Sequence, residues 1–114
     1  KKLKIGISIN PKKFDKIYLK SVHPLIDIIY YDLNVYTDSH ITTYSLTDYL
    51  NQIKFLKNLD IQIYIGGGIN NKNAKQVIEL VSPSGLDVSR SLKDENNNIS
   101  LLKLNELQMS LSAA

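Results

Sequence analysis

IQIYIGGGIN, residues 61–70, is the stretch that decides the fold of this chain. Residues rich in β-branched side chains run into Gly66, Gly67 and Gly68, and Asn70 then opens an amphipathic pattern. This order predicts a buried strand, a turn of bare backbone and a helix capped by Asn70. Each glycine costs conformational entropy on folding, so three in succession indicate close approach of a ligand, and the positive end of a helix favours a phosphate. The alternative is a tight turn without a ligand.

Composition narrows the class of protein. The chain has 114 residues with 43% hydrophobic content, which suits a single domain over residues 1–114. It contains no cysteine, which fits a cytoplasmic location and excludes disulfides and thiolate metal sites. No apolar run approaches the ~20 residues of a membrane span. The net charge is +3, but the N-terminal lysines lack the interleaved aromatic residues of a nucleic-acid interface, so we expect no nucleic acid and no membrane as partner.

Strand-like and helix-like patterns alternate four times along the chain. The predicted strands cover residues 3–9, 26–33, 61–65 and 86–89; the predicted helices cover 10–22, Ser45 or Thr47 to Leu56, 70–81 and 100–111. Right-handed crossovers place four such strands in one parallel sheet. The sequence therefore predicts an α/β fold of four βα units, either half of an eight-stranded barrel or a small open sheet with helices on both faces.

Helical spacing also predicts which side chains face the sheet. The expected inward residues are Phe14, Ile17, Tyr18 and Val22 in the first helix; Leu46, Tyr49, Leu50, Ile53 and Leu56 in the second; Ala74, Val77, Ile78 and Val81 in the third; and Leu101, Leu104, Leu107 and Leu111 in the last. Residues 91–98 are expected to form a polar loop.

Polar residues follow the predicted strands where each ends, and they are Asn10, Asp32, Asn34, Asp87, Ser89, Arg90 and Ser91. The carboxyl ends of parallel strands meet at one edge, so these residues are expected to lie beside the glycine turn. Asp32 ends an apolar strand and either acts as a general acid or base or caps the next loop. Arg90 could add a guanidinium to an anion site. No His and carboxylate pair has metal-ligand spacing, so neither a metal nor a cofactor is expected.

Two motifs carry a resemblance to a known family. Ile65–Asn70, followed by Asn73 and a helix, and then Pro83-x-Gly85-Leu86-Asp87-Val88-Ser89, resemble the C-terminal part of phosphoribosylanthranilate isomerase. That family is a (β/α)8 barrel of tryptophan biosynthesis. The resemblance implies that the chain is strands five to eight of the barrel, half of a TIM barrel. It also implies a sugar phosphate as the ligand and an intramolecular aldose–ketose isomerase, which converts an aminoaldose to an aminoketose.

The same resemblance implies roles for individual residues. Phosphate-binding roles fall on Gly67, Gly68, Ser89 and Ser91. Asp87 matches the family's substrate-contacting Asp, and Asp32 matches its general acid. Arg90-Ser91 replaces the family's Ser-Gly, so the second phosphate turn lacks its glycine and Arg90 becomes a substrate-binding candidate.

The family's general base is a Cys at the end of the first strand, and this chain has neither that Cys nor the first four strands. Alone, the chain is therefore expected to be inactive or nearly so, and to pair with an N-terminal half or with itself. A non-catalytic half-barrel that binds phosphate or self-assembles is one alternative. Ribulose-phosphate 3-epimerase is another, because Gly6-x-x-x-Asn10-Pro11 resembles its first segment, but Gly66 stands where that family has a metal-binding Asp.

Overall fold

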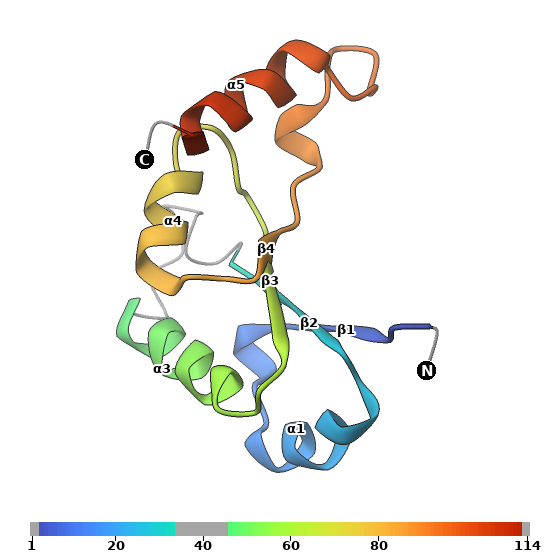
Figure 1. Ribbon diagram of the computed structural model, residues 1–114, viewed down its shortest axis with the longest axis vertical. Helices are drawn as coiled ribbons and strands as arrows, with labels where there is room; N and C mark the ends of the chain where they lie inside the picture. Colours follow the sequence, from blue (N-terminus) through green and yellow to red (C-terminus); the bar gives the residue numbers. More distant parts are fainter. Residues whose placement is uncertain (1–2, 34–45, 113–114) are drawn as a thin grey trace.

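The computed structural model describes residues 3–33 and 46–112 as a four-stranded parallel sheet with its helices outside (Figure 1). The strand order is β1-β2-β3-β4, the same as the order along the chain. The elements are β1 (Gly6–Ile9), η1 (Pro11–Lys13), α1 (Lys16–Val22), η2 (His23–Leu25), β2 (Ile28–Asp32), α3 (Leu46–Lys57), β3 (Gln62–Gly66), α4 (Ala74–Val81), β4 (Gly85–Leu86), η3 (Arg90–Leu92) and α5 (Leu101–Ser112). The predicted α/β fold of four βα units is confirmed.

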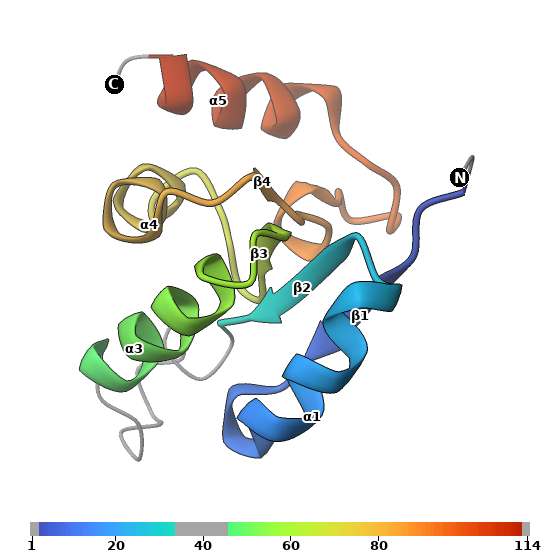
Figure 2. The ribbon, with the colours of Figure 1, turned by 60° about the horizontal axis from the view of Figure 1, so that its bottom comes forward.

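Burial along the strands decides between the half-barrel and the two-faced open sheet. In β2 and β3, Ile29, Tyr31, Ile63 and Ile65 are at most 2% exposed and form one core with side chains from α1, α3, α4 and α5. Successive residues of a strand point to opposite faces, and the opposite face carries no helix among the described residues. Figure 2 shows the helices around one side of the sheet, with the other side open. One covered face and one open face are the arrangement of half a (β/α)8 barrel.

The open face carries two tyrosines between two glycines. Tyr30 and Tyr64 are register neighbours on β2 and β3, and their ring centroids are 5.7 Å apart. A Cβ added at Gly6 would lie 2.8 Å from Tyr30 Cε2, and one added at Gly85 would lie 2.7 Å from Tyr64 Cε2. The glycines of the outer strands thus provide the space that the rings of the inner strands fill.

The first helix differs from its prediction in start and in face. Asn10 Oδ1 accepts from Lys12 N–H at 2.9 Å and begins the short η1 turn, whereas the side chain of Asp15 caps α1. The interrupted start rotates the helix, so that Leu19 is buried while Ile17 is 83% exposed. Phe14 and Val22 are half-buried, but the predicted inward positions of Ile17 and Tyr18 are wrong.

The second and third helices bury the faces that were predicted. Tyr49, Ile53 and Leu56 of α3 are buried, as are Ala74, Val77 and Val81 of α4. Leu50 and Ile78 are half-buried beside them. Of the two proposed caps, Ser45 lies outside the described residues and Thr47 lies inside the first turn, as does Leu46, whose side chain is not described.

In the C-terminal part of the chain, the last strand is shorter than predicted, and the predicted polar loop contains a short helix. β4 ends at Leu86, so Asp87 lies just beyond it. Residues 90–92 form η3 with Leu92 buried, which corrects the predicted polar loop. In α5, Leu107 is buried, but Leu101 is 72% exposed. The helix is tied at both ends, where Ser100 N–H donates to Leu92 O at 2.7 Å and Ser110 Oγ donates to Asn71 O at 3.0 Å. The predicted inward position of Leu101 is wrong, whereas Leu104 and Leu111 are half-buried against the core.

Candidate functional site

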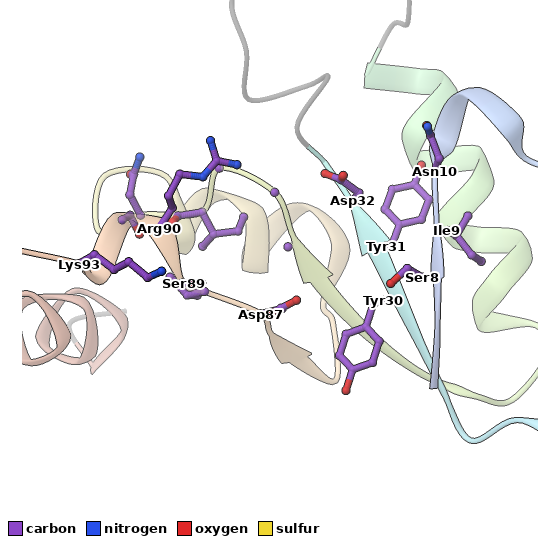
Figure 3. A pocket seen from close by; sticks show the side chains of 17 residues that line it. Ser8, Ile9, Asn10, Tyr30, Tyr31, Asp32, Asp87, Ser89, Arg90 and Lys93 are labelled. Atoms are coloured by element: carbon purple, nitrogen blue, oxygen red, sulfur yellow. Dashed lines mark hydrogen bonds between the residues drawn. The ribbon is translucent and has the colours of Figure 1, made fainter. Parts of the chain in front are cut away.

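A pocket of about 830 Å³ opens at the edge where the four strands end (Figure 3). Every strand end contributes to it, and its lining is Ser8, Ile9, Asn10, Tyr30, Tyr31, Asp32, Gly66, Gly67, Gly68, Ile69, Asn70, Asp87, Val88, Ser89, Arg90, Ser91 and Lys93. All seven predicted site residues therefore line one pocket. Asn34, the other predicted strand-end residue, lies outside the described residues.

The ends of β1 and β2 are joined by a side chain from α3. Tyr31 Oη donates to Gln52 Oε1 at 2.6 Å, and Gln52 Nε2 donates to the carbonyl oxygen of Pro11 at 3.1 Å. Tyr31 is fully buried, while Asp32, the next residue, is exposed at the pocket. The Gln52 bridge thus holds Asn10 and Asp32, which follow β1 and end β2, at a set separation.

Glycine is needed at these three positions for two different physical reasons. Gly67 and Gly68 adopt φ of 87° and 78°, a region that side chains disfavour, so the turn needs glycine there. Gly66 is needed for space, because a Cβ at this position would lie 3.1 Å from Asp87 O and 3.4 Å from Asp87 Oδ2. Backbone pairing places Gly66 beside Asp32 on its other side. Asp32 and Asp87, the two candidate acids, therefore lie on either side of Gly66, where the end of β3 carries no side chain.

The helix behind the turn starts later than predicted. Asn70 does not cap it directly: Asn70 Oδ1 accepts from Lys72 N–H at 2.8 Å and from Asn73 N–H at 3.1 Å, and α4 begins at Ala74. Asn73 returns toward the turn by donating from Nδ2 to Gly68 O at 2.8 Å. The pocket reaches Asn70 but includes no residue of α4. The glycine turn, which Asn70 and Asn73 hold by hydrogen bonds, therefore lies at the pocket, whereas the N-terminus of α4 does not.

The turns after β3 and β4 are tied together. Ser91 Oγ donates to the carbonyl oxygen of Ile69 at 2.6 Å, which confirms that the two turns lie side by side. This bond uses the hydroxyl proton of Ser91. Ser89 is exposed, and Ser89 O accepts from Leu92 N–H as η3 begins.

Charge is divided across the pocket. Asp32 and Asp87 lie near the sheet, whereas Lys93 lies beyond Ser89 and Arg90 extends above it, as Figure 3 shows. A ligand with an anionic end is thus oriented, because its anion and the carboxylates repel. Groups of three or more His, Cys, Asp or Glu side chains able to hold a metal are absent from residues 3–33 and 46–112.

Ser8, Tyr30 and Lys93 are among the lining residues that sequence reasoning missed. Strand alternation was the signal for the first two, since Ser8 and Tyr30 lie two residues before Asn10 and Asp32 on the same face. Lys93 belonged to a predicted loop, and its place depends on the pairing of residue 93 with Ile99. The polar run between these two residues predicts a loop but does not indicate which of its side chains faces the pocket.

Comparisons with known proteins show what the chain is similar to. No protein-family profile matches the chain. It is 30% identical over 113 residues to N-(5'-phosphoribosyl)anthranilate isomerase of Methanococcus aeolicus, and covers 53% of that protein. The structure superposes on the same enzyme from Pyrococcus furiosus with a TM-score of 0.60 and 20% identity, covering 96% of this chain and 50% of that one. Phosphoribosyl anthranilate isomerase from Thermus thermophilus gives a TM-score of 0.51 and 16% identity, covering 96% of this chain and 61% of that one.

The chain thus spans about half the length of the curated relative that it matches. The resemblance to phosphoribosylanthranilate isomerases is confirmed, and so is an α/β fold consistent with half of a (β/α)8 barrel. Within the described residues, no helix is long and apolar enough to cross a membrane.

Proposed function

We propose that this chain is the sugar-phosphate-binding half of a phosphoribosylanthranilate-isomerase-like barrel. The observation that carries the proposal is the convergence of the Gly66–Gly68 turn and the Ser89–Ser91 turn on one pocket, tied by the bond from Ser91 Oγ to Ile69 O. Loops after the last two strands form the phosphate site in many (β/α)8 enzymes. The similarity over nearly the whole chain to an enzyme named for a phosphoribosyl substrate supports the same ligand class.

The phosphate is expected to lie between these two turns. Glycines at 67 and 68 allow the backbone to approach an anion closely, and Ser89 and Ser91 line the same pocket from the other turn. Arg90 adds a charge-assisted contact, which replaces what the family obtains from a glycine. This placement directs the sugar toward the carboxylates at the ends of β2 and β4.

Asp32 is the proposed general acid. It donates a proton to the ring oxygen of the ribose, so that the ring opens and the aminoaldose can rearrange to the aminoketose. Asp87, across Gly66 from Asp32, contacts the substrate and helps to orient it. The general base is not among these residues, and we propose that it comes from the half of the barrel that lies outside this chain.

The second half is the proposed protein partner. β1 and β4 are the outer strands of the sheet, so each has one edge that is open in the structure. An apolar groove of about 480 Å³ runs along β4 and α5, with Leu86, Val88, Leu92 and Leu104 among its lining residues. Leu3 at the β1 end and Leu101 at the α5 end are 79% and 72% exposed. A second half of four strands with their helices would cover these surfaces and close the barrel.

The alternatives are less well supported. An epimerase would need an Asp in place of Gly66, but even a Cβ there lies within 3.4 Å of three Asp87 atoms. A non-catalytic half-barrel would use the two open edges, yet it gives no reason for two acids and two turns to converge on one pocket.

The test is titration of the ¹⁵N-labelled chain with ribose 5-phosphate. The amide signals of residues 66–70 and 89–92 should shift together with one dissociation constant. Gly67→Val places a side chain at the anion's approach and should abolish the shifts. Gln76→Val, an exposed change on α4, is the control. Shifts confined to other residues at millimolar ligand would show that the turn is purely structural.

A further inference from the structure

We propose that Lys93 supplies a second fixed positive charge to the phosphate site, so that the site selects the doubly ionised form of a phosphate monoester. The inference rests on the proposed function and adds a specificity residue to it. Lys93 lines the pocket, and in Figure 3 its side chain runs from the far wall toward Ser89, beneath Arg90. Neither the glycine turn nor the Ser89–Ser91 turn carries a formal charge apart from Arg90.

The backbone of Lys93 is held in place by its surroundings. Its N–H donates to Arg90 O at 3.3 Å, its carbonyl oxygen accepts from Lys103 Nζ at 2.5 Å, and it forms an antiparallel bridge with Ile99. The side chain is half-buried, so its stem is not free to sweep through solvent. A cation held in this way loses less entropy on binding an anion than a fully exposed lysine does.

The charges around Lys93 leave it available to a ligand. The adjacent carboxylate, Asp94, is turned into its own loop, where Oδ1 accepts from Asn96 N–H at 2.8 Å and Asn98 N–H at 3.1 Å. Across the pocket lie Asp32 and Asp87, and Arg90 lines the same wall as Lys93, with its guanidinium above the Lys93 side chain in Figure 3. Among residues 3–33 and 46–112, the structure gives no ion pair to Lys93 or Arg90. Two like charges on one wall of a pocket repel, and an anion bound between them offsets that repulsion.

The ligand chemistry follows from the number of charges. A phosphate monoester carries about −1.5 to −2 at pH 7 and loses its second proton near pH 6. One guanidinium matches the monoanion, whereas Arg90 and Lys93 together match the dianion. The affinity for a phosphate monoester should therefore rise as the pH passes through about 6, and Lys93 should be responsible for most of that rise.

The experiment measures the dissociation constant of ribose 5-phosphate for the whole chain, from the amide shifts of Gly67 and Ser89, at about pH 5 and about pH 7.5. Lys93→Gln should weaken binding roughly tenfold at the higher pH and much less at the lower, the range expected for one charge-assisted contact. Lys75→Gln removes the same charge from an exposed position on α4 and should bind like the unaltered chain at both.

Each outcome decides the matter. If Lys93→Gln binds as tightly as Lys75→Gln at both pH values, or loses the same factor at both, Lys93 does not select the dianion, while the proposed function stands. If the unaltered chain shows no shift at Gly67 or Ser89, both proposals are wrong.

Discussion

Replacing Gly66 by Ala tests whether residue 66 must lack a side chain for Asp87 to keep its position. The added Cβ would lie 3.1 Å from Asp87 O, 3.2 Å from Asp87 Cβ and 3.4 Å from Asp87 Oδ2. Asp87 N–H donates to Ile65 O at 2.8 Å, so the backbone there resists movement. Rotation of the side chain does not move O or Cβ, so residue 87 is expected to shift as a whole, against this hydrogen bond, by a few tenths of an ångström, and its carboxylate moves with it.

Stability and binding should respond differently to this change. Gly66 is paired in β3 and does not have positive φ, so Ala gains about 0.5–1 kcal/mol from reduced chain entropy, which offsets much of the strain. The free energy of unfolding should change by less than about 1 kcal/mol. A displaced Asp87 forfeits a hydrogen bond from a sugar hydroxyl to its charged carboxylate, worth about 1.5–3 kcal/mol, so the affinity for ribose 5-phosphate should fall roughly ten- to hundredfold.

The assay is a double-mutant cycle in which ribose 5-phosphate is titrated into Gly66→Ala, Asp87→Ala and the double variant, with urea unfolding of each. If Gly66 acts through Asp87, the double variant should bind no more weakly than Asp87→Ala. Additive losses, or unchanged affinity in Gly66→Ala, would refute the reasoning that Gly66 is bare for the sake of Asp87.

Two further predictions concern stability, measured by urea unfolding. Gly85→Ala should lower the free energy of unfolding by about 1–3 kcal/mol through overpacking, because its Cβ would lie 2.7 Å from Tyr64 Cε2. Adding Tyr64→Leu to this variant should recover part of the loss. Fully additive losses in the double variant would contradict the overpacking. Gln52→Leu should lower the free energy of unfolding by about 2 kcal/mol, since it removes hydrogen bonds with Tyr31 and Pro11 worth about 1 kcal/mol each. Gln76→Leu, on the exposed side of α4, should be near neutral. Equal losses in the two variants would rule out the Gln52 bridge.

Local patterns were enough to predict the elements and most of the site. The run from Ile61 to Asn70 predicts strand, turn and helix, because β-branched residues, glycines and apolar spacing each report a local backbone preference. Parallel order along the chain then brings the strand ends together, so Asp32, Asp87 and Ser89 could be expected at one edge. These inferences need only the order of the elements.

The faces of the end helices could not be predicted in the same way. A competing cap at Asp15 rotates α1, so that Leu19 is buried and Ile17 exposed. In α5, Leu101 satisfies the apolar spacing, but of that row only Leu104, Leu107 and Leu111 pack into the core. Periodicity reports which residues share a face, and the packing partners decide where that face begins and ends.

By itself, the sequence determined the α/β alternation, the glycine turn and the polar residues that follow each strand, because these depend on short-range chemistry. Only the tertiary structure decided that one face of the sheet is open, that Gly66 makes room for Asp87, and that Lys93 reaches the pocket. Each of these joins residues separated by a strand, a turn or a helix. Their positions are set by the closure of the whole sheet against its helices, which no window of sequence contains.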